Sequence, residues 1–417
     1  MIRAIKRALY FPVAYYFRFW AKIALNSWKP VIIVITGSSG KTTLLHLIES
    51  QIGNKARYSH NANSSFGIPF NILGLKRKKL TIDEWFFLFL LAPSQAFRPN
   101  PKEKLYVVEA DCDRPGEGKF LASFLKPEIT LWISSGLTHS ANFDYLVKNK
   151  KFNTVEEAIA NEFGYFLEYT KKLAVVNIDN SLIQKQIRRT SALVEQTTSK
   201  SLKSYEINGD SSKFVIEDKE YSFNFIAPKE MFYSIMMSKL LTKTLNLPFD
   251  ETFKKFNLPP GRNTILRGTK NITIIDSTYN ATPDGVKAIL EMYGKYSSQS
   301  KWLVLGDMVE LGEGTGEEHR KIANIINSMD LSKVILIGPR VSKYTFPKLK
   351  KNAINFVLPK DGLDYILKNI NGGEVILFKG ARFLEGIIEH LLEDKKDVEK
   401  LVRREKAWQN RRRAWGL

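Results

Sequence analysis

The feature that most constrains the fold is a glycine-containing loop between a short apolar run and a helical run. The loop reads Thr36-Gly37-Ser38-Ser39-Gly40-Lys41-Thr42-Thr43, after the apolar run Val31 to Ile35 and before the helical run Leu44 to Ile48. In such a turn the glycines let backbone N–H groups face phosphate oxygens, and the N-terminus of the next helix adds favourable partial charge. The strand, turn and helix therefore predict a phosphate-binding site in an α/β fold, with an ordinary surface loop as the alternative.

Two side chains of this loop have separate expected tasks. Lys41 is placed to reach the terminal phosphates of a nucleotide, and Thr42 is placed to coordinate magnesium. Residue 35 is isoleucine, whereas the longer Walker pattern has glycine there. The match to that general pattern is therefore partial.

Short apolar runs alternate with helical segments along most of the chain. Buried strands are expected at Val31 to Ile35, Leu105 to Val108, Ile129 to Ile133, Leu173 to Val176, Ile272 to Ile275, Trp302 to Leu305, Val334 to Ile337 and Val375 to Phe378. A hairpin at 214–226 and a helix at 230–245 precede the break at Pro259-Pro260-Gly261. This alternation predicts a central P-loop ATPase-like α/β domain with a parallel sheet, followed by a smaller Rossmann-like α/β domain.

Length and composition agree with two globular units. A chain of 417 residues exceeds what one hydrophobic core usually organises, and 44% hydrophobic with 25% charged residues is ordinary for globular proteins. We expect a basic N-terminal segment at 1–30, a central domain at 31–260, a C-terminal domain at 261–393 and a basic tail at 394–417. The single cysteine, Cys112, cannot form an internal disulfide, which fits a reducing cytosol.

The formal net charge of +20 is concentrated toward the two ends. Residues 1–30 contain six basic residues and no acidic one, and residues 394–417 contain nine basic and four acidic residues. Such ends either contact anionic lipid or nucleic acid, or form a solvated surface. No known nucleic-acid-reading module accompanies the charge, so no specific nucleic acid is expected as a partner.

The N-terminal segment has the pattern of an element at a membrane–water interface. Apolar residues recur at helical spacing from Ile2 to Trp20, basic residues recur on another face, and Pro12 is expected to divide the stretch into two short helices. The charge-free run 8–17 is shorter than the roughly 20 residues that span a bilayer. We expect peripheral contact with the anionic inner face of the membrane, assisted by the run Trp85 to Leu91. A helix packed on the protein core is the alternative.

The loop resembles the nucleotide loop of the Mur ligase superfamily, and eight further blocks agree with that family in order. They are Asn63 to Pro69, Val108-Glu109, Thr138-His139, Asn177 to Asp179, Gly261-Arg262, Asp276 to Pro283, Gly306 to Gly312 and Lys379-Gly380. The resemblance covers about residues 30–393 and is closest to members that add D-alanyl-D-alanine to a UDP-N-acetylmuramoyl-tripeptide. It implies a cytoplasmic, ATP-dependent ligase that activates the carboxylate of a cell-wall precursor as an acyl phosphate and joins it to the amine of an amino acid or dipeptide.

The resemblance also implies a role for individual residues, and in each case the alternative is a structural one. ATP and Mg2+ are the implied cofactors. The implied nucleotide-binding residues are Gly37, Ser38, Ser39, Gly40, Lys41, Thr42, Thr43, Arg262, Asp276, Tyr279 and Asn280, with Asp276 on the ribose hydroxyls. The implied metal ligands are Thr42, Glu109 and His139, and the implied catalytic group is Lys41, Glu109, His139 and Arg262. Contacts to the incoming amine are implied for Asp307, Glu310, Lys379 and Arg382; Asp307 and Glu310 alternatively hold the domain together.

The chain departs from the family pattern in three places. Most members have a carbamoylated lysine in the helix after the histidine block, but the expected position here is Phe163, and the neighbouring Glu162 could supply a carboxylate only with local rearrangement. Only about 30 residues precede the loop, so we expect the usual N-terminal UDP-sugar-binding domain to be missing. Residues 76–104 resemble an insertion, either core or, given the basic run Lys76 to Lys79, an interface.

Three other functions stay open at this point. The first is a ligase of the same superfamily with a non-cell-wall acceptor, which the blocks at 276–283 and 306–312 disfavour. The second is a noncatalytic nucleotide-binding partner protein, suggested by Phe163 and by the expected absence of the N-terminal domain. The third is a nucleic-acid-binding ATPase, suggested by charge alone.

Overall fold

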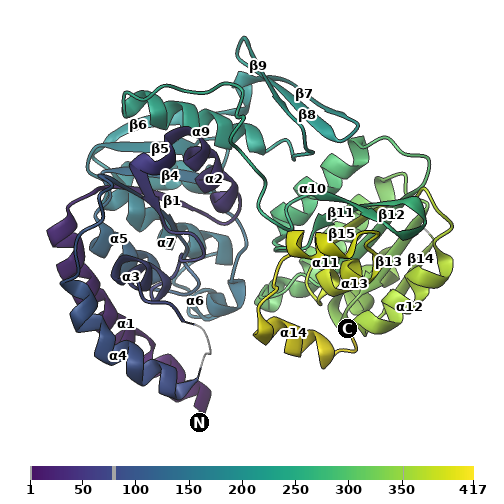
Figure 1. Cartoon of the computed structure of the whole chain (residues 1–417), viewed down its shortest axis with the longest axis horizontal. Coiled ribbons are helices and arrows are strands. Elements are labelled where there is room, and N and C mark those ends of the chain that lie inside the picture. The colour runs from purple at the N-terminus through teal and green to yellow at the C-terminus, as the bar shows by residue number, and fades with distance from the viewer. Residues whose placement is uncertain (1, 78–80, 351) are drawn as a thin grey trace.

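The computed structural model describes residues 2–77, 81–350 and 352–417, and its two six-stranded sheets lie side by side (Figure 1). The strand order of the first sheet is β2-β3-β1-β4-β5-β6, and every pairing in it is parallel. Its strands are β1 (Val31–Gly37), β2 (Ala56–Tyr58), β3 (Leu105–Ala110), β4 (Ile129–Ser134), β5 (Leu173–Asn177) and β6 (Leu193–Thr197). The predicted strands are present, and the short β2 and the half-exposed β6 were not predicted.

Helices cover both faces of this sheet, which explains why its central strands are apolar throughout. Ile32 and Val34 of β1 face one core, and Ile33 and Ile35 face the other. The first core is covered by α1 (Ile2–Trp28), α3 (Gly67–Leu73), α4 (Ile82–Ala96), α5 (Glu117–Leu125) and α7 (Val155–Glu168). The second is covered by α2 (Lys41–Ile52) and α9 (Met231–Thr244). Two short helices, α6 (Asp144–Lys148) and α8 (Ser181–Gln186), flank α7.

A small antiparallel sheet follows the first sheet. It consists of β7 (Leu202–Asn208), β8 (Ser211–Ile216) and β9 (Lys219–Phe223). The predicted hairpin is therefore confirmed as β8 and β9, and the predicted helix after it is α9. The strand β7 was not predicted.

The second sheet has the order β10-β11-β15-β12-β13-β14, and only β10 runs antiparallel to its neighbour. Its strands are β10 (Thr264–Gly268), β11 (Ile272–Ser277), β12 (Lys301–Gly306), β13 (Lys333–Ile337), β14 (Ala353–Phe356) and β15 (Val375–Lys379). One face is covered by α10 (Pro283–Lys295) and α11 (Thr315–Ser328), and the other by α12 (Pro359–Asn369) and α13 (Leu384–Leu391). The predicted fold class, two successive α/β units with the P-loop in the first, is confirmed.

The N-terminal segment forms one helix, so the predicted division at Pro12 is wrong. α1 continues through Pro12, and Ala14, Phe17 and Ala21 are completely buried against the first core. Proline removes one helical hydrogen bond, but packing on the C-terminal side of Pro12 and ring contacts of Tyr10 on its N-terminal side hold the helix together. The alternative interpretation, a helix packed on the core, therefore describes the inner face of α1.

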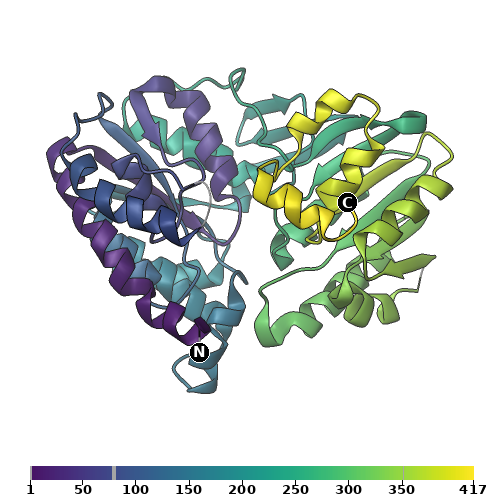
Figure 2. The same ribbon diagram turned by 60° about the horizontal axis from the view of Figure 1, so that its bottom comes forward.

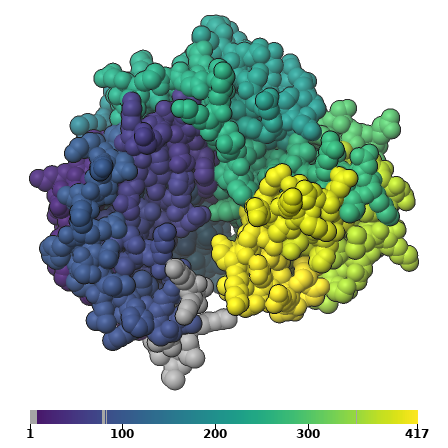
Figure 3. Space-filling model, in the orientation of Figure 1, coloured from purple at the N-terminus to yellow at the C-terminus, as the bar shows by residue number. Residues whose placement is uncertain are grey.

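Residues 394–417, expected from the sequence to be a basic tail outside the second domain, are packed against the second half. The segment contains a 3-10 helix (Lys395–Lys400) and α14 (Lys406–Arg413), and Leu401, Val402 and Arg412 are buried. The segment, yellow in Figures 2 and 3, lies over the second half and borders the hollow between the two halves. Arg403, Arg404 and Arg412 of this segment have partners within the fold, which the charge count did not indicate.

Candidate active site

The glycine loop is pinned to the end of β4. Gly37 has φ 135, and a Cβ there would lie 2.6 Å from the carbonyl oxygen of Ser134, so only glycine permits this approach. The hydroxyl of Ser134 accepts a hydrogen bond from Ser39 N (2.9 Å) and donates one to Ser39 O (2.8 Å), and Ser38 N donates to Ser134 O (3.2 Å). The loop then enters α2 through Gly40, which has φ 83. The backbone is thus shaped for an anion at the N-terminus of α2.

Lys41 and Thr42 each contact a carboxylate from β3 or the segment after it. The buried ammonium of Lys41 lies 2.8 Å from Asp111 and also donates to Gly37 O. Burial disfavours the charged ammonium, but the carboxylates of Asp111 and Glu109 outweigh burial and raise the pKa of Lys41. Thr42 Oγ1 donates to Glu109 Oε2 (2.9 Å). The predicted phosphate and magnesium groups are therefore adjacent, with Thr43 half-buried in the next position.

His139 lies where the two halves meet. Its Nε2 is 3.1 Å from Asp113, and its Nδ1 is 2.6 Å from Glu310, which comes from the second half. Burial opposes protonation, but Glu310 and Asp113 raise the pKa of His139 to about 9. In this arrangement Glu310 pairs with His139, and the backbone N–H of Ala141 also donates to Glu310 O (3.0 Å). These contacts tie the two halves together beside the loop.

Sequence reasoning missed two carboxylates that are close to His139. Asp111, Asp113 and His139 each offer a ligand atom, and these atoms lie within 4.8 Å of one another. Carboxylate oxygens suit magnesium, and the imidazole supplies a third donor. The sequence did contain an indication of these ligands. Glu109, Asp111 and Asp113 are every second residue at the end of a buried strand, so in an extended segment their side chains point to the same side.

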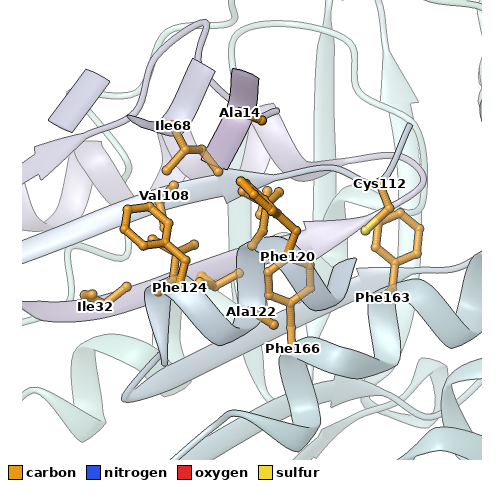
Figure 4. Packing of buried hydrophobic residues seen from close by; sticks show 14 of the residues in the cluster. Ala14, Ile32, Ile68, Val108, Cys112, Phe120, Ala122, Phe124, Phe163 and Phe166 are labelled. Carbon is orange, nitrogen blue, oxygen red and sulfur yellow. The ribbon is translucent and has the colours of Figure 1, made fainter. Parts of the chain in front are cut away.

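Neither residue at the expected carbamoyl-lysine position faces this cluster. Phe163 is completely buried in the first core, where it lies beside Cys112 (Figure 4). The two oxygens of Glu162 accept hydrogen bonds from Gly116 N and Gly118 N, both 2.9 Å, at the start of α5. The suggestion that Glu162 replaces the carbamate is therefore wrong, because its carboxylate caps a helix.

In the second half, the region around the end of β11 contains buried polar atoms without protein partners. Asp276 ends β11 and is completely buried; its Oδ1 accepts from Thr278 N (2.9 Å) and Thr278 Oγ1 (2.7 Å), whereas Oδ2 has no partner. Burial raises the pKa of Asp276 to about 6, against the effect of these hydrogen bonds. Arg262 Nε also has no partner. Because unpaired buried polar atoms are costly, both fit a ligand that supplies the missing partners.

Arg262 and Tyr279 form one unit on this edge. The guanidinium of Arg262 stacks 4.2 Å from the ring of Tyr279, and Tyr279 N donates to Gly261 O (3.2 Å). Burial lowers the pKa of Arg262, and the carboxylate of Glu109 in the first half opposes that shift. Asn280 is exposed, and its side-chain oxygen accepts from Ala281 N (2.7 Å), so in this structure it caps a turn. Arg262 and Tyr279 therefore lie together on the edge of the second half.

The four residues predicted to contact the amine do not form one group. Lys379 pairs in register with Ser277 and is buried; burial and nearby Arg262 lower its pKa to about 7, while Asp276 opposes them. Lys379 therefore belongs to the edge with Asp276. The carboxylate of Asp307 is completely buried and accepts from Arg340 N (2.9 Å), Val341 N (3.0 Å) and Arg382 Nε (2.9 Å). For Asp307 the structural interpretation is thus favoured, and Arg382 is its partner.

The C-terminal segment contributes a residue that sequence reasoning missed. Arg403 donates to Thr278 O (3.2 Å) and Tyr279 O (2.8 Å), and Arg412 donates to Arg403 O (2.8 Å). Arg403 thereby fixes the carbonyl groups of the turn that follows Asp276. No pattern in the tail indicates this contact, because it joins residues more than 120 positions apart in the chain.

Comparison with known proteins agrees with this geometry. Residues 261–382 match the family described as "Mur ligase, glutamate ligase domain". Residues 261–382 are thus similar to the C-terminal domain of Mur ligases. The chain as a whole is 24% identical over 391 residues to the UDP-N-acetylmuramoyl-tripeptide–D-alanyl-D-alanine ligase of Buchnera aphidicola, covering 88% of this chain and 78% of that protein. It is 26% identical over 373 residues to the enzyme of the same name from Borreliella burgdorferi, covering 84% of this chain and 72% of that protein.

Solved structures of Mur ligases share the fold. The MurF ligase from Thermotoga maritima, solved in complex with ADP, superimposes with a TM-score of 0.73 at 22% identity and covers 93% of this chain and 84% of its own. The pseudomurein peptide ligase type C from Methanothermus fervidus gives a TM-score of 0.58 at 16% identity, with 87% and 79% covered. These structures confirm the predicted fold class, a parallel α/β domain followed by a second α/β domain. The predicted loss of an N-terminal domain is not supported, because the Mur ligase relatives match 84% and 88% of this chain.

Proposed function

We propose that the protein is an ATP-dependent ligase that joins D-alanyl-D-alanine to the peptide of a UDP-N-acetylmuramoyl-tripeptide. The observation that carries the proposal is the seam, where the two halves meet at the contact between His139 and Glu310. The first half brings Lys41 and Glu109 to its side of the seam, and the second half keeps buried atoms of Asp276 and Arg262 unpaired. The curated relatives named for this reaction support the choice of substrates. The cytoplasm is the proposed location, with a peripheral position at the inner face of the membrane as the finer proposal.

ATP would lie across the seam in this proposal. Residues 37–43 would bind the phosphates, Asp276 would accept hydrogen bonds from the ribose hydroxyls, and Arg262 would reach the phosphates from the second half. The buried, unpaired Oδ2 of Asp276 and Nε of Arg262 match these groups in chemical character. Thr42 and Glu109 would hold one Mg2+, and Asp111, Asp113 and His139 are the candidate ligands for a second.

The chemistry needs two transfers, and both atoms and charge balance. An oxygen of the acceptor carboxylate attacks the γ-phosphorus of ATP, and the bond from that phosphorus to the oxygen of the β-phosphate breaks. The products of this first transfer are an acyl phosphate and ADP. The amine of the dipeptide then attacks the acyl carbon, phosphate leaves and one proton passes to solvent or a base. Lys41 and Arg262 would offset the charge that develops on the transferred phosphoryl group, so positioning and electrostatics supply most of the rate.

The second metal position would not need carbon dioxide. Most Mur ligases have a carbamoylated lysine there, and Phe163, which occupies the position expected from the sequence, is buried in the core. Asp111 and Asp113 offer carboxyl oxygens without any modification, and these atoms lie within 4.8 Å of a ring nitrogen of His139. The proposed enzyme is therefore independent of bicarbonate.

The decisive experiment identifies the product by mass. Purified protein is incubated with ATP, Mg2+, UDP-N-acetylmuramoyl-tripeptide and D-alanyl-D-alanine, and the expected product is heavier than the tripeptide by the dipeptide minus water, with one ADP for each bond. Omitting the dipeptide, or replacing it with D-alanine or L-alanyl-L-alanine, tests the amine. Nucleotide binding without turnover under all these conditions would instead support a noncatalytic partner protein, and turnover with a non-cell-wall acceptor would replace the proposed substrate.

A further inference from the structure

α1 and α4 form an adjacent pair of helices on the outer surface of the first half, away from the second sheet (Figures 1 and 2). The ring of Tyr16 lies 4.9 Å from the ring of Phe89, and the hydroxyl of Tyr16 donates to Phe89 O (2.7 Å). The inner faces of the two helices enter the first core, with Phe17 of α1 and Leu88 and Ala92 of α4 buried. The packing of the pair against the sheet is therefore complete without its outer face.

That outer face carries most of the exposed large hydrophobic side chains. Among the described residues fourteen are exposed, and eight belong to this pair or its end: Leu9, Tyr15, Phe19, Phe86, Phe87, Leu90, Leu91 and Phe97. The other six are distributed over the rest of the molecule. Ring contacts connect the two helices on this side, from Phe19 to Trp20 (5.0 Å) and from Trp20 to Phe97 (6.4 Å). We call these eight residues the α1/α4 patch.

The exposure within the α1/α4 patch is large. Phe86, Phe87 and Leu90 are 62%, 60% and 61% exposed, although the core needs only one face of α4. Scattered exposed hydrophobic residues need no explanation, but eight of the fourteen on one pair of adjacent helices favour a binding surface. Of the two sequence alternatives for residues 76–104, the inner face of α4 fits the core, and the exposed face leaves an interface as a proposal.

The charge around the α1/α4 patch is strongly positive. Residues 1–30 contain six basic and no acidic residues, and residues 76–104 contain seven basic and three acidic residues, so the two segments supply ten of the chain's net twenty charges. Lys22, Lys76 and Arg77 are exposed; Lys78 and Lys79 lie outside the described residues. Aromatic side chains flanked by lysine and arginine are the composition of elements that lie in the interface of an anionic bilayer.

The same charge argues against a second copy of the chain as the occupant. Two patches packed face to face would bring two groups of ten net positive charges together, whereas anionic lipid headgroups neutralise them. Among the helices that the structure describes, none has the length and apolar character to cross a bilayer. Contact with a membrane through this face would therefore be in the plane of its surface.

We propose that the α1/α4 patch docks on the surface of an anionic phospholipid bilayer. The aromatic and leucine side chains of α4, with Phe19 of α1, enter the boundary between headgroups and acyl chains, and Lys22 and Lys76 contact the headgroups. This surface lies apart from the nucleotide seam, so the proposal does not depend on the proposed ligase activity. Its consequence is that the seam would operate close to a membrane.

The test is flotation of the full-length protein with two vesicle compositions, phosphatidylcholine alone and phosphatidylcholine with one third phosphatidylglycerol. We expect binding to the anionic vesicles, weak binding to the neutral ones, and release by salt. Phe86→Ser with Leu90→Ser should lower the bound fraction at limiting lipid about tenfold. Leu193→Ser with Leu367→Ser removes two exposed hydrophobic side chains outside the patch and should leave binding within about twofold of the unmodified protein.

A second set of variants separates charge from hydrophobicity and protects the test against misfolding. Lys22→Glu with Lys76→Glu should weaken anionic binding about tenfold, while Lys348→Glu with Lys368→Glu, exposed on the second half, should have little effect. If the circular dichroism spectrum shows that Phe86→Ser with Leu90→Ser is misfolded, Phe87→Ser with Leu91→Ser is tested in its place. Absence of binding to anionic vesicles, equal binding by patch and control variants, or a dimer in sedimentation velocity that the patch variants dissociate without any lipid binding would overturn the proposal.

Discussion

The two edges that meet at the seam differ in how their charged groups are partnered. On the edge of the first sheet, Lys41 pairs with Asp111, Thr42 with Glu109, and His139 with Asp113. On the edge of the second sheet, Asp276 Oδ2 and Arg262 Nε are buried without partners. A ligand at the first edge replaces or joins partners that these side chains already have. A ligand at the second edge supplies hydrogen-bond partners to atoms that lack them.

This difference predicts a division of labour between the edges. At the first edge, a phosphate or a metal ion replaces or joins carboxylates that already hold the cations in position, so these groups are arranged for chemistry before substrate arrives. At the second edge, the energetic cost of unpaired buried atoms is removed only when a ligand binds, so this edge contributes mainly to affinity. Substitutions on the two edges should therefore change different quantities.

Lys41→Ala should have the largest effect. Loss of the ammonium removes charge stabilisation from the phosphoryl group and leaves Asp111 without its cation, so product formation should fall about a thousandfold or more. The rate of ADP formation with both substrates measures it, and circular dichroism confirms the fold. Lys55→Ala, exposed just beyond α2, is the matched control and should behave like the unmodified protein. Near-normal turnover by Lys41→Ala would show that the loop on the first edge is not the catalytic site.

Asp113→Asn should have the next largest effect. The change removes a hard oxygen ligand and the anionic partner of His139, so we expect activity to fall roughly ten- to a hundredfold, with a higher Mg2+ concentration needed for half-maximal rate. Asp218→Asn, on an exposed turn, is the control. Bicarbonate should neither stimulate the unmodified protein in carbon-dioxide-free buffer nor restore the variant. Strong stimulation by bicarbonate would show that a carbamoylated lysine acts in this chain.

Asp276→Asn sharpens the comparison because it should weaken the binding of ADP and leave the binding of pyrophosphate unchanged. Loss of the carboxylate that accepts from the ribose should weaken ADP binding about tenfold, as expected for hydrogen bonds to a charged group, while pyrophosphate binding should not change. Isothermal titration with both ligands measures this difference. If pyrophosphate binding weakens equally, Asp276 acts on the phosphate loop or on the fold, and the division between the edges is not real.

Arg403→Ala should have the smallest effect, about two- to fivefold weaker ADP binding, because Arg403 acts only through the carbonyl groups of Thr278 and Tyr279. Arg413→Ala, exposed in α14, is the control for lost charge. Equal affinities for the two variants would mean that the C-terminal segment only packs on the second half.

The parts of this fold that sequence analysis predicted are those set by local pattern. Apolar runs identified the buried parallel strands, and the order of glycine, lysine and threonine identified the loop after β1, because strand burial and phosphate binding each require particular residue types at short spacing. The antiparallel β10, the half-exposed β6 and the continuous helix through Pro12 were missed, since pairing and tertiary packing decide them.

The site divides in the same way. Lys41, Thr42 and Glu109 could be placed because they lie at a strand end and in the turn that it approaches. For Asp307 the sequence left substrate contact and a structural role open, and Arg382 was expected to contact the substrate. In the structure the carboxylate of Asp307 accepts from Arg382 and from the N–H groups at 340–341, a relation between distant residues. Arg403 was not foreseen for the same reason, and Asp111 and Asp113 were overlooked although their alternation with Glu109 was visible in the sequence.

The most direct test of the account is a crystal structure of the protein with ADP and Mg2+. The account predicts one nucleotide across the seam, with its diphosphate against residues 37–43, a ribose hydroxyl within hydrogen-bond distance of Asp276 Oδ2, and a metal ion within reach of Thr42 and Glu109. A nucleotide that contacts only one of the two edges, or that leaves Asp276 Oδ2 and Arg262 Nε without partners, would contradict it.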